Sequence, residues 1–386
     1  MFRKIQDAFD NFLSPVKPVP VGSYQYQGTQ DSQVPFRLNL RVEPNGEGIL
    51  ILNASTVLHL NRTAAEFAYH LIQQTPIDPT ALTISERYDI SVEDARKDIE
   101  DFIARLDTLI NTPDLDPVTY LDMERVEPYS KKLSAPYRLD CALTYRVSEK
   151  ASQTAAPVER VTRELNQAEW CSILEKAQSA GIPHVVFTGG EPTLRDDLPA
   201  LIAKTEQLGI VSGLLSDGLR FSEKKYMQSI LNTGLDHIML LADPQEKRFW
   251  KALANLMPQD IAVTVHFTLT KTDRAEAVHT LQKLAKADVH SLSLSAEDIN
   301  TQEELNDLQN NAVDLGFSLV WDLPVPYSQY NPIALELQQG GERLAKGAGN
   351  AWLYVEPDGD VLPAQGINRV MGNLLKNDWF SIWKKR

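Results

Sequence analysis

Cysteine is scarce in this chain. Its 386 residues include two, Cys141 and Cys171. Two thiols provide no disulfide framework, and by themselves they cannot supply the ligands of an iron–sulfur cluster or a four-ligand zinc site. The seven histidines do not compensate, because they are scattered without the spacing of a metal site or a neighbouring nucleophile. The sequence therefore predicts neither metal ligands nor catalytic residues.

Long apolar runs and a surplus of positive charge are also absent. No stretch of about 18 apolar residues exists to cross a bilayer, and the N-terminus lacks the pattern of a signal peptide. The formal net charge is -14 at pH 7, which argues against broad binding to nucleic acid or anionic lipid, because both need excess Lys and Arg. We expect a cytoplasmic protein that binds no nucleic acid and no membrane.

The first third of the chain predicts a small mixed domain. Apolar residues at helical spacing in residues 1–13 predict a short amphipathic helix, and the Pro-, Gly- and Gln-containing stretch to residue 33 predicts a linker. Three strand-like runs follow, at residues 37–42, 48–52 and 56–60. Three helical patterns come next, at residues 63–73, 81–87 and 91–110, the first with the spacing of a capping box. This order predicts a winged-helix-like domain.

Strands and helices alternate from residue 138 onward. Seven strand-like runs are predicted, at residues 138–145, 184–188, 210–215, 237–241, 261–269, 291–295 and 318–321. Helical periodicity fills the gaps, so we expect a parallel sheet with right-handed crossovers, closed or partly closed into a barrel. Functional groups should lie at the carboxyl ends of these strands. Residues 350–365 predict a hairpin with a Pro-Asp-Gly turn.

The most informative motif is the end of the strand that begins at His184. The apolar run breaks at Thr188-Gly-Gly-Glu-Pro192. The glycines allow a sharp turn and a close approach to a ligand, and Pro192 has no N–H to continue the ladder. Glu191 is thus placed at a strand tip, where it either meets the amine of a ligand or caps the segment that follows.

Three features in this order resemble a radical SAM protein. They are Gly189-Gly-Glu-Pro192, a preceding strand that ends in Leu143-Thr-Tyr-Arg146, and a late Val355-Glu-Pro-Asp-Gly-Asp-Val-Leu-Pro363. The N-terminal strands and helices resemble the PqqD-like domains that recognise leader peptides. The resemblance implies an α/β fold class: a partial (β/α)6-type radical SAM barrel with an N-terminal winged-helix-like PqqD-type domain and a short C-terminal β-hairpin extension.

The resemblance divides the chain into five parts. They are an amphipathic helix and linker (1–33), a PqqD-like peptide-recognition domain (34–112), a linker (113–136), a radical SAM-like barrel (137–325) and a degenerate SPASM-like extension (326–386).

Cysteine is missing where the resemblance requires it. Radical SAM proteins hold a [4Fe-4S] cluster on three cysteines after the first barrel strand, because thiolates are soft, anionic ligands for iron. In this chain the equivalent positions, and two in the C-terminal extension, are Val147, Ala151, Thr154, Tyr354 and Ala364. The sequence therefore argues against a [4Fe-4S] cluster, predicts no bound cofactor, and leaves S-adenosylmethionine open as a ligand.

Two groups of binding residues are implied by the resemblance. The residues that would meet S-adenosylmethionine are Gly189, Gly190, Glu191, Pro192, Ser216 and Asp217. An extended peptide would add to the edge of the small sheet and pack against the helix that begins near Ser91. That edge consists of Thr56, Val57, Leu58, His59 and Leu60.

These observations favour a pseudoenzyme. The hypothesis is a non-catalytic radical SAM homologue that serves as a peptide-recognition or scaffolding subunit, with a leader peptide and a catalytically active radical SAM relative as partners, in peptide or cofactor maturation. Two alternatives stay open. One is an enzyme that binds S-adenosylmethionine for non-radical chemistry or uses a cluster supplied in trans. The other is a metabolite sensor whose barrel binds a small molecule.

Overall fold

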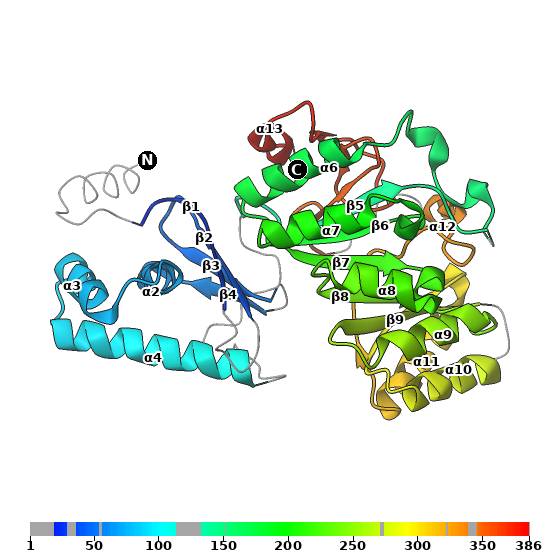
Figure 1. The fold of residues 1–386 in the computed structure, drawn as a ribbon, viewed down its shortest axis with the longest axis horizontal. Helices are drawn as coiled ribbons and strands as arrows, with labels where there is room; N and C mark the ends of the chain where they lie inside the picture. Colours follow the sequence, from blue (N-terminus) through cyan, green and yellow to red (C-terminus); the bar gives the residue numbers. More distant parts are fainter. Residues whose placement is uncertain are drawn as a thin grey trace. The chain divides into compact units, whose positions relative to one another are not determined.

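The computed structural model describes residues 19–28, 36–53, 56–112, 133–149, 151–270, 274–321, 323–338 and 346–385. The helix predicted at residues 1–13 and most of both predicted linkers lie outside these residues. The chain divides into two compact units. One consists of residues 1–130 with 179–183, and the other of residues 131–178 with 184–386 (Figure 1).

The N-terminal unit contains an antiparallel sheet in the order β1-β2-β3-β4. Its strands are β1 (Gly22–Gln27), β2 (Arg37–Val42), β3 (Gly48–Leu52) and β4 (Thr56–Leu60). Alternate residues point to one face, and this face forms an apolar core that includes Leu40, Leu50 and Leu58. Three helices follow: α2 (Arg62–Ile72), α3 (Ile77–Tyr88) and α4 (Val92–Asn111). The three strands and three helices predicted from the sequence are confirmed.

Strand β1 corrects the predicted linker. The sequence analysis placed residues 22–27 in an exposed linker, but they pair with β2 along its full length. Tyr24 lies opposite Leu40 and Tyr26 opposite Leu38, and both rings pack against the sheet core. Aromatic residues favour strands when a neighbouring face is available to pack against. Gln25 separates the two tyrosines, and the Gln- and Gly-containing residues around them hide this pattern in the sequence.

Helix α2 begins differently from the prediction. The proposed capping box is wrong, because the N-cap is Asn61, whose side chain accepts from the amide of Ala64 at 2.9 Å. Glu66, the presumed partner in the box, is buried and forms an ion pair with Arg87 at 3.0 Å. The carboxylate of Glu66 therefore binds Arg87 and not the backbone at the start of α2.

The second unit is built on a ten-stranded sheet in the order β11-β10-β9-β8-β7-β6-β5-β12-β13-β14. Seven strands match the predicted runs: β5 (Arg138–Thr144), β6 (His184–Gly189), β7 (Val211–Ser216), β8 (His237–Leu241), β9 (Ala262–Leu269), β10 (Ser291–Ala296) and β11 (Ser318–Leu319). Neighbours among these seven are parallel. The α/β fold class is thus confirmed.

Helices connect these strands, as the periodicity predicted (Figure 1). They are α6 (Gln167–Ser179), α7 (Leu198–Gln207), α8 (Lys224–Leu231), α9 (Lys247–Leu256), α10 (Arg274–Lys286) and α11 (Gln302–Asp314). The described helices include none that is long and apolar enough to cross a membrane.

The C-terminal extension continues the same sheet. Its elements are α12 (Ile333–Gln338), β12 (Trp352–Val355), β13 (Asp360–Leu362), β14 (Gly372–Asn373) and α13 (Trp379–Trp383). β12 and β13 form the predicted antiparallel hairpin. β12 also pairs in parallel with β5, so the extension lies directly beside the first strand of the barrel, which the sequence did not indicate.

Candidate functional site

The strand-end turn at Gly189 and Gly190 is held by the loop that follows β5. The amide of Gly190 donates to the carbonyl oxygen of Thr144, and the amide of Glu191 donates to that of Arg146, both at 2.8 Å. Gly189 has a φ of 121°, and a Cβ on Gly190 would lie 2.1 Å from the oxygen of Arg146. The strand-end turn and the loop after β5 can therefore approach this closely only with glycine at positions 189 and 190.

The carboxylate of Glu191 is bound by groups from two strand ends. Its Oε1 accepts from the amide of Thr193 and the hydroxyl of Ser216, both at 2.9 Å. Its Oε2 accepts from the amide of Asp217 at 2.7 Å. Because β6 and β7 are parallel neighbours, their C-terminal ends meet at one edge of the sheet. The structure thus brings Glu191, Ser216 and Asp217 together, while their role toward a cofactor stays a prediction.

The site combines the buried carboxyl group of Glu191 with the half-buried one of Asp217. Burial and the neighbouring Asp217 raise the pKa of Glu191 to about 8. Asp217 Oδ1 accepts from the amide of Leu219 at 2.9 Å, whereas its Oδ2 is buried and has no hydrogen-bond partner among the described residues. A cation bound here would offset the repulsion between the carboxylates and use the unpaired oxygen. These donors and acceptors fit the ammonium group of an amino-acid-like ligand.

Glu191 also performs the capping role that was left open. It is the N-cap of the short 3-10 helix η3 (Pro192–Leu194), through its bond to the amide of Thr193. Capping and the bonds from Ser216 and Asp217 use three lone pairs of the carboxylate. Its two oxygens offer about four lone-pair sites, so one is left that a bound ammonium could use.

Three of the five positions expected to carry cysteine lie in one apolar cluster. Val147, Ala151 and Tyr354 are buried and pack with Tyr145 and Tyr327, among others.

The other two positions lie apart from that cluster. Thr154 is exposed, and its hydroxyl contacts that of Ser152 at 2.7 Å. Ala364 is half-buried. None of the five side chains offers a thiolate, so this donor set does not fit the three-cysteine ligand pattern that the resemblance implies.

The two cysteines lie in regular structure. Cys141 is fully buried in β5, where burial and the adjacent Asp140 raise the pKa of its thiol. A neutral thiol in such a place packs as a small apolar side chain. Cys171 lies in α6. Within the part of the chain that is described, no group of three or more His, Cys, Asp or Glu side chains is arranged to hold a metal ion.

The predicted peptide edge is strand β4. It pairs with β3 on one side and forms an outer edge of the sheet. Leu58 and Leu60 point into the core, whereas Thr56, Val57 and His59 are half-buried. An outer strand is the structural requirement for adding a peptide strand, so the geometry is compatible with the prediction.

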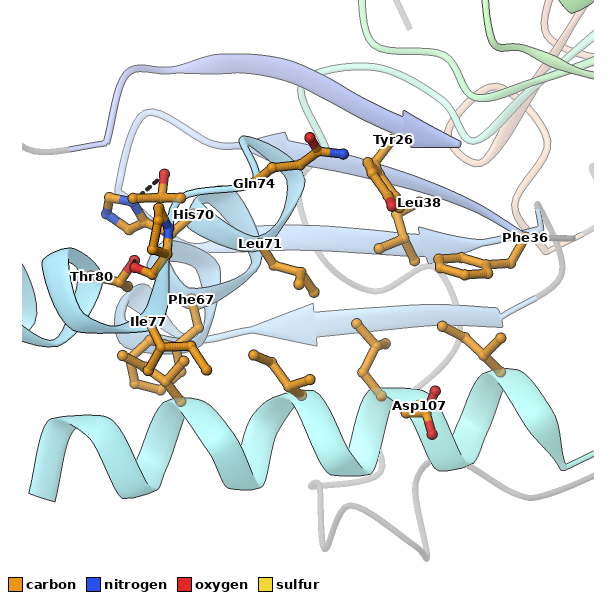
Figure 2. A pocket seen from close by; sticks show the side chains of 16 residues that line it. Tyr26, Phe36, Leu38, Phe67, His70, Leu71, Gln74, Ile77, Thr80 and Asp107 are labelled. Atoms are coloured by element: carbon orange, nitrogen blue, oxygen red, sulfur yellow. Dashed lines mark hydrogen bonds between the residues drawn. The ribbon is translucent and has the colours of Figure 1, made fainter. Parts of the chain in front are cut away.

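A cavity that the sequence did not indicate lies in the same unit. It has a volume of about 460 Å³ and lies between α2, α4 and the sheet (Figure 2). Ile99, Ile103 and Leu106 of α4 form one wall, with Phe67 and Leu71 of α2 among the residues lining it. The apolar stripe on α4 was visible in the sequence, but helical periodicity cannot show that the described residues leave a cavity beside it.

Comparison with known proteins finds one family model and several curated relatives that are similar to this chain. Residues 48–109 match the model of coenzyme PQQ synthesis protein D (PqqD). The PqqA peptide cyclase of Methylorubrum populi is 26% identical over 275 residues, covering 62% of this chain and 68% of the relative. The PqqA peptide cyclase of Gluconobacter oxydans is 36% identical over 109 residues, covering 28% of this chain and 30% of the relative.

Solved structures also include proteins with a similar fold. The crystal structure of Streptococcus suis SuiB matches with a TM-score of 0.59 and 17% identity, covering 90% of this chain and 86% of SuiB. SuiB bound to its precursor peptide SuiA and SuiB bound to S-adenosylmethionine each match with a TM-score of 0.58 and 16% identity. Fold and site thus define an α/β protein with a glycine-rich strand end and a PqqD-like domain in front. In these features the chain is similar to PqqA peptide cyclases in sequence and to SuiB in fold.

These comparisons correct the prediction about cofactors. The sequence analysis predicted no bound cofactor, argued against a [4Fe-4S] cluster and left S-adenosylmethionine open. The comparisons contradict the expectation of no cofactor for this chain, because its relatives are named PqqA peptide cyclases and SuiB, which it resembles in fold, is described bound to S-adenosylmethionine. The presence of two cysteines does not show that a cluster has been lost.

Proposed function

We propose that this chain recognises a peptide in a peptide-modification system. It acts as a recognition or scaffolding subunit, and a catalytically active radical SAM partner carries out the chemistry. The proposal is supported by relatives that are PqqA peptide cyclases and by a similar structure, SuiB, that is described bound to its precursor peptide. Recognition is assigned to residues 34–112, and residues 137–325 and 326–386 supply the scaffold.

The observation that carries the proposal is the edge strand β4 of the PqqD-like domain. A peptide added to β4 would extend the antiparallel sheet through main-chain hydrogen bonds, and side-chain pockets would supply specificity. Among the described strands, β1 is the other outer strand of the sheet, since it pairs with β2 on one side. Strand addition is assigned to β4 because the match to PqqD covers residues 48–109, which include β4 but not β1.

Hydrogen exchange tests this assignment. On binding of a PqqA precursor peptide, the amides of β4 (residues 56–60) that face away from β3 should exchange at least tenfold more slowly, because new ladder bonds protect them. Residues 37–42 of β2 serve as the internal control, since β2 already lies between two strands. Peptide binding without protection of β4 would contradict strand addition.

The assignment of catalysis to a partner is supported by the side chains at the family's cysteine positions. Val147, Ala151 and Tyr354 are packed together there. We expect the peptide to stay unmodified when it is incubated with this chain, S-adenosylmethionine and reductant, and to be modified once a cysteine-bearing relative is added. Mass spectrometry of the peptide measures both outcomes, and modification by this chain alone would show that it is itself the enzyme.

A second candidate function, an enzyme that binds S-adenosylmethionine, is favoured by one observation. Glu191 and Asp217 form a carboxyl pair with an unpaired carboxylate oxygen. An ammonium placed beside them would lower the raised pKa of Glu191, which is about 8, so the bound state holds fewer protons. Binding at pH 7 should therefore release up to about one proton per molecule.

Isothermal titration calorimetry checks this proton release. The apparent enthalpy of S-adenosylmethionine binding should differ between phosphate and Tris in proportion to their ionisation enthalpies. In Glu191→Gln the dependence on the buffer should disappear, because the titrating group is gone. Tight binding with the same enthalpy in both buffers would mean that the ammonium does not lie beside Glu191.

A further inference from the structure

The cavity in the N-terminal unit has the size of a ligand site. Its volume of about 460 Å³ falls within the range of about 300–1,000 Å³ that is usual for binding pockets. Ile99, Ile103, Leu106 and Ile110 line it from α4. These positions recur every three or four residues, so they form a wall about 16 Å long on one side of the helix.

The opposite walls of the cavity come from several elements. Phe67 and Leu71 of α2, Ile77 of α3, Leu38 of β2 and Tyr26 of β1 contribute apolar surface, and Figure 2 shows these side chains between α4 and the sheet. No residue of β4 lines the cavity. The cavity is therefore separate from the strand edge proposed above, and the two can contact different parts of one peptide.

The rim of the cavity on α4 is acidic. Asp107 lines the cavity and is exposed, and its carboxylate accepts from the neutral side chain of Asn111 at 2.9 Å. Glu100, also exposed, precedes it by seven residues and so projects from the same side of α4, within about 20°. The lining residues include no Lys or Arg.

One histidine, His70, also lines the cavity. Its Nδ1 lies 3.3 Å from the hydroxyl of Thr75, and burial together with Arg87 lowers its pKa. The imidazole is therefore neutral at pH 7 and adds no positive charge to the cavity. Arg96 projects from the same side of α4, but it is paired with Asp78 at 2.6 Å. Asp107 and Glu100 therefore set the sign of the potential along the α4 rim.

From these contacts we infer that the cavity binds a peptide segment in which bulky apolar side chains are followed by Lys or Arg. The apolar side chains would fill the space between α4 and α2, and the basic group would face Asp107 and Glu100. This inference rests on the proposed function and names the class of peptide that it recognises. Burying one large apolar side chain contributes enough to dominate such an interaction, and the charges select the sequence.

Three synthetic peptides test the inference with the full chain. They are fluorescein-labelled decapeptides on a common Gly-Ser background: one carries two Phe and two Lys, the second has Glu in place of Lys, and the third has Ser in place of Phe. By fluorescence anisotropy, the first should bind at least tenfold more tightly than either of the others. Equal affinity for all three would overturn the inference.

Variants of α4 locate the binding. The double substitution Glu100→Gln and Asp107→Asn should reduce the preference for Lys over Glu at least threefold and leave the preference for Phe over Ser unchanged. Asp98→Asn is the matched control, because Asp98 is exposed on the opposite side of α4. An equal loss of preference in the control would contradict a site at the Asp107 rim.

Filling the cavity is the complementary test. Ile103→Trp should weaken the Phe-containing peptide at least tenfold. If this variant does not fold, as judged by circular dichroism, the charge variants decide.

Two outcomes separate this inference from the proposed function. Protection of β4 by the precursor peptide without any preference among the probes would overturn this inference alone. Lack of β4 protection together with lack of preference would overturn the proposed function too. Probe binding that needs removal of residues 1–18 would assign the cavity to the chain's own N-terminal segment and overturn the inference.

Discussion

An alanine at position 190 is expected to lower the unfolding free energy by about 3 kcal/mol. The new Cβ would lie 2.1 Å from the carbonyl oxygen of Arg146 and 2.9 Å from its carbonyl carbon. Both atoms belong to the backbone, so the clash cannot be relieved by rotating a side chain. Relief requires the loop after β5 to move away, which breaks the bond from the Gly190 amide to Thr144. Urea unfolding of Gly190→Ala measures the effect.

Gly316 provides the matched control for this substitution. It has a φ of 87°, but a Cβ there would have nothing within 4 Å. Gly316→Ala therefore tests backbone strain without a clash and should cost about 1 kcal/mol. If Gly190→Ala costs no more than Gly316→Ala, the close approach between the glycine turn and the β5 loop does not contribute to stability as described.

Acidification from pH 7 to pH 4 is expected to cost about 3 kcal/mol of stability through His266 alone. This side chain is buried in β9, and its two ring nitrogens lie 3.0 Å from the hydroxyls of Ser293 and Ser295. Burial lowers the pKa of His266 to about 4. The folded protein therefore keeps the ring neutral while the unfolded chain takes up a proton below its ordinary pKa of about 6.5.

The sign of this effect follows from the lowered pKa. The contribution of His266 is fully present above about pH 6.5 and is lost as the pH falls toward about 4. Buried carboxyl groups with raised pKa values, such as Glu191, act in the opposite direction, so the clean measurement is a difference between two proteins. In urea unfolding, the wild type should lose about 3 kcal/mol more than His266→Gln between pH 7 and pH 4.

An exposed histidine is the control for the pH experiment. The side chain of His290 is 78% exposed, so His290→Gln should show the same dependence on pH as the wild type. If His266→Gln also follows the wild type, the imidazole of His266 is protonated in the folded state without penalty. The hydroxyl groups of Ser293 and Ser295 would then accept hydrogen bonds from a charged ring.

Much of the fold could be predicted because its signals are local. The seven parallel strands from β5 to β11 were predicted with small boundary errors, since each is a short apolar run bounded by turns and separated by helical periodicity. The glycine turn was predicted for a similar reason. Gly189 and Gly190 stand at a strand end, and the close approach that they permit is found against Thr144 and Arg146.

Other features depend on residues that are distant in the sequence, and the pattern could not show them. β1 was taken for a linker because Tyr24 and Tyr26 become strand residues only beside Leu40 and Leu38 of β2. Glu66 matched a capping pattern, but Arg87 binds it instead. In both cases a tertiary contact outweighs a weak local preference.

The candidate sites show the same division. Residue type and spacing alone predicted the seven parallel strands, the carboxylate at a strand end and the lack of cysteine where the resemblance implies cluster ligands. The folded structure was needed to show that Glu191 is bound by Ser216 and Asp217. It was also needed to show that the described residues leave a cavity beside α4. The physical reason is that carboxylate electrostatics and cavity volume depend on which distant side chains pack nearby, and residue order alone does not specify that packing.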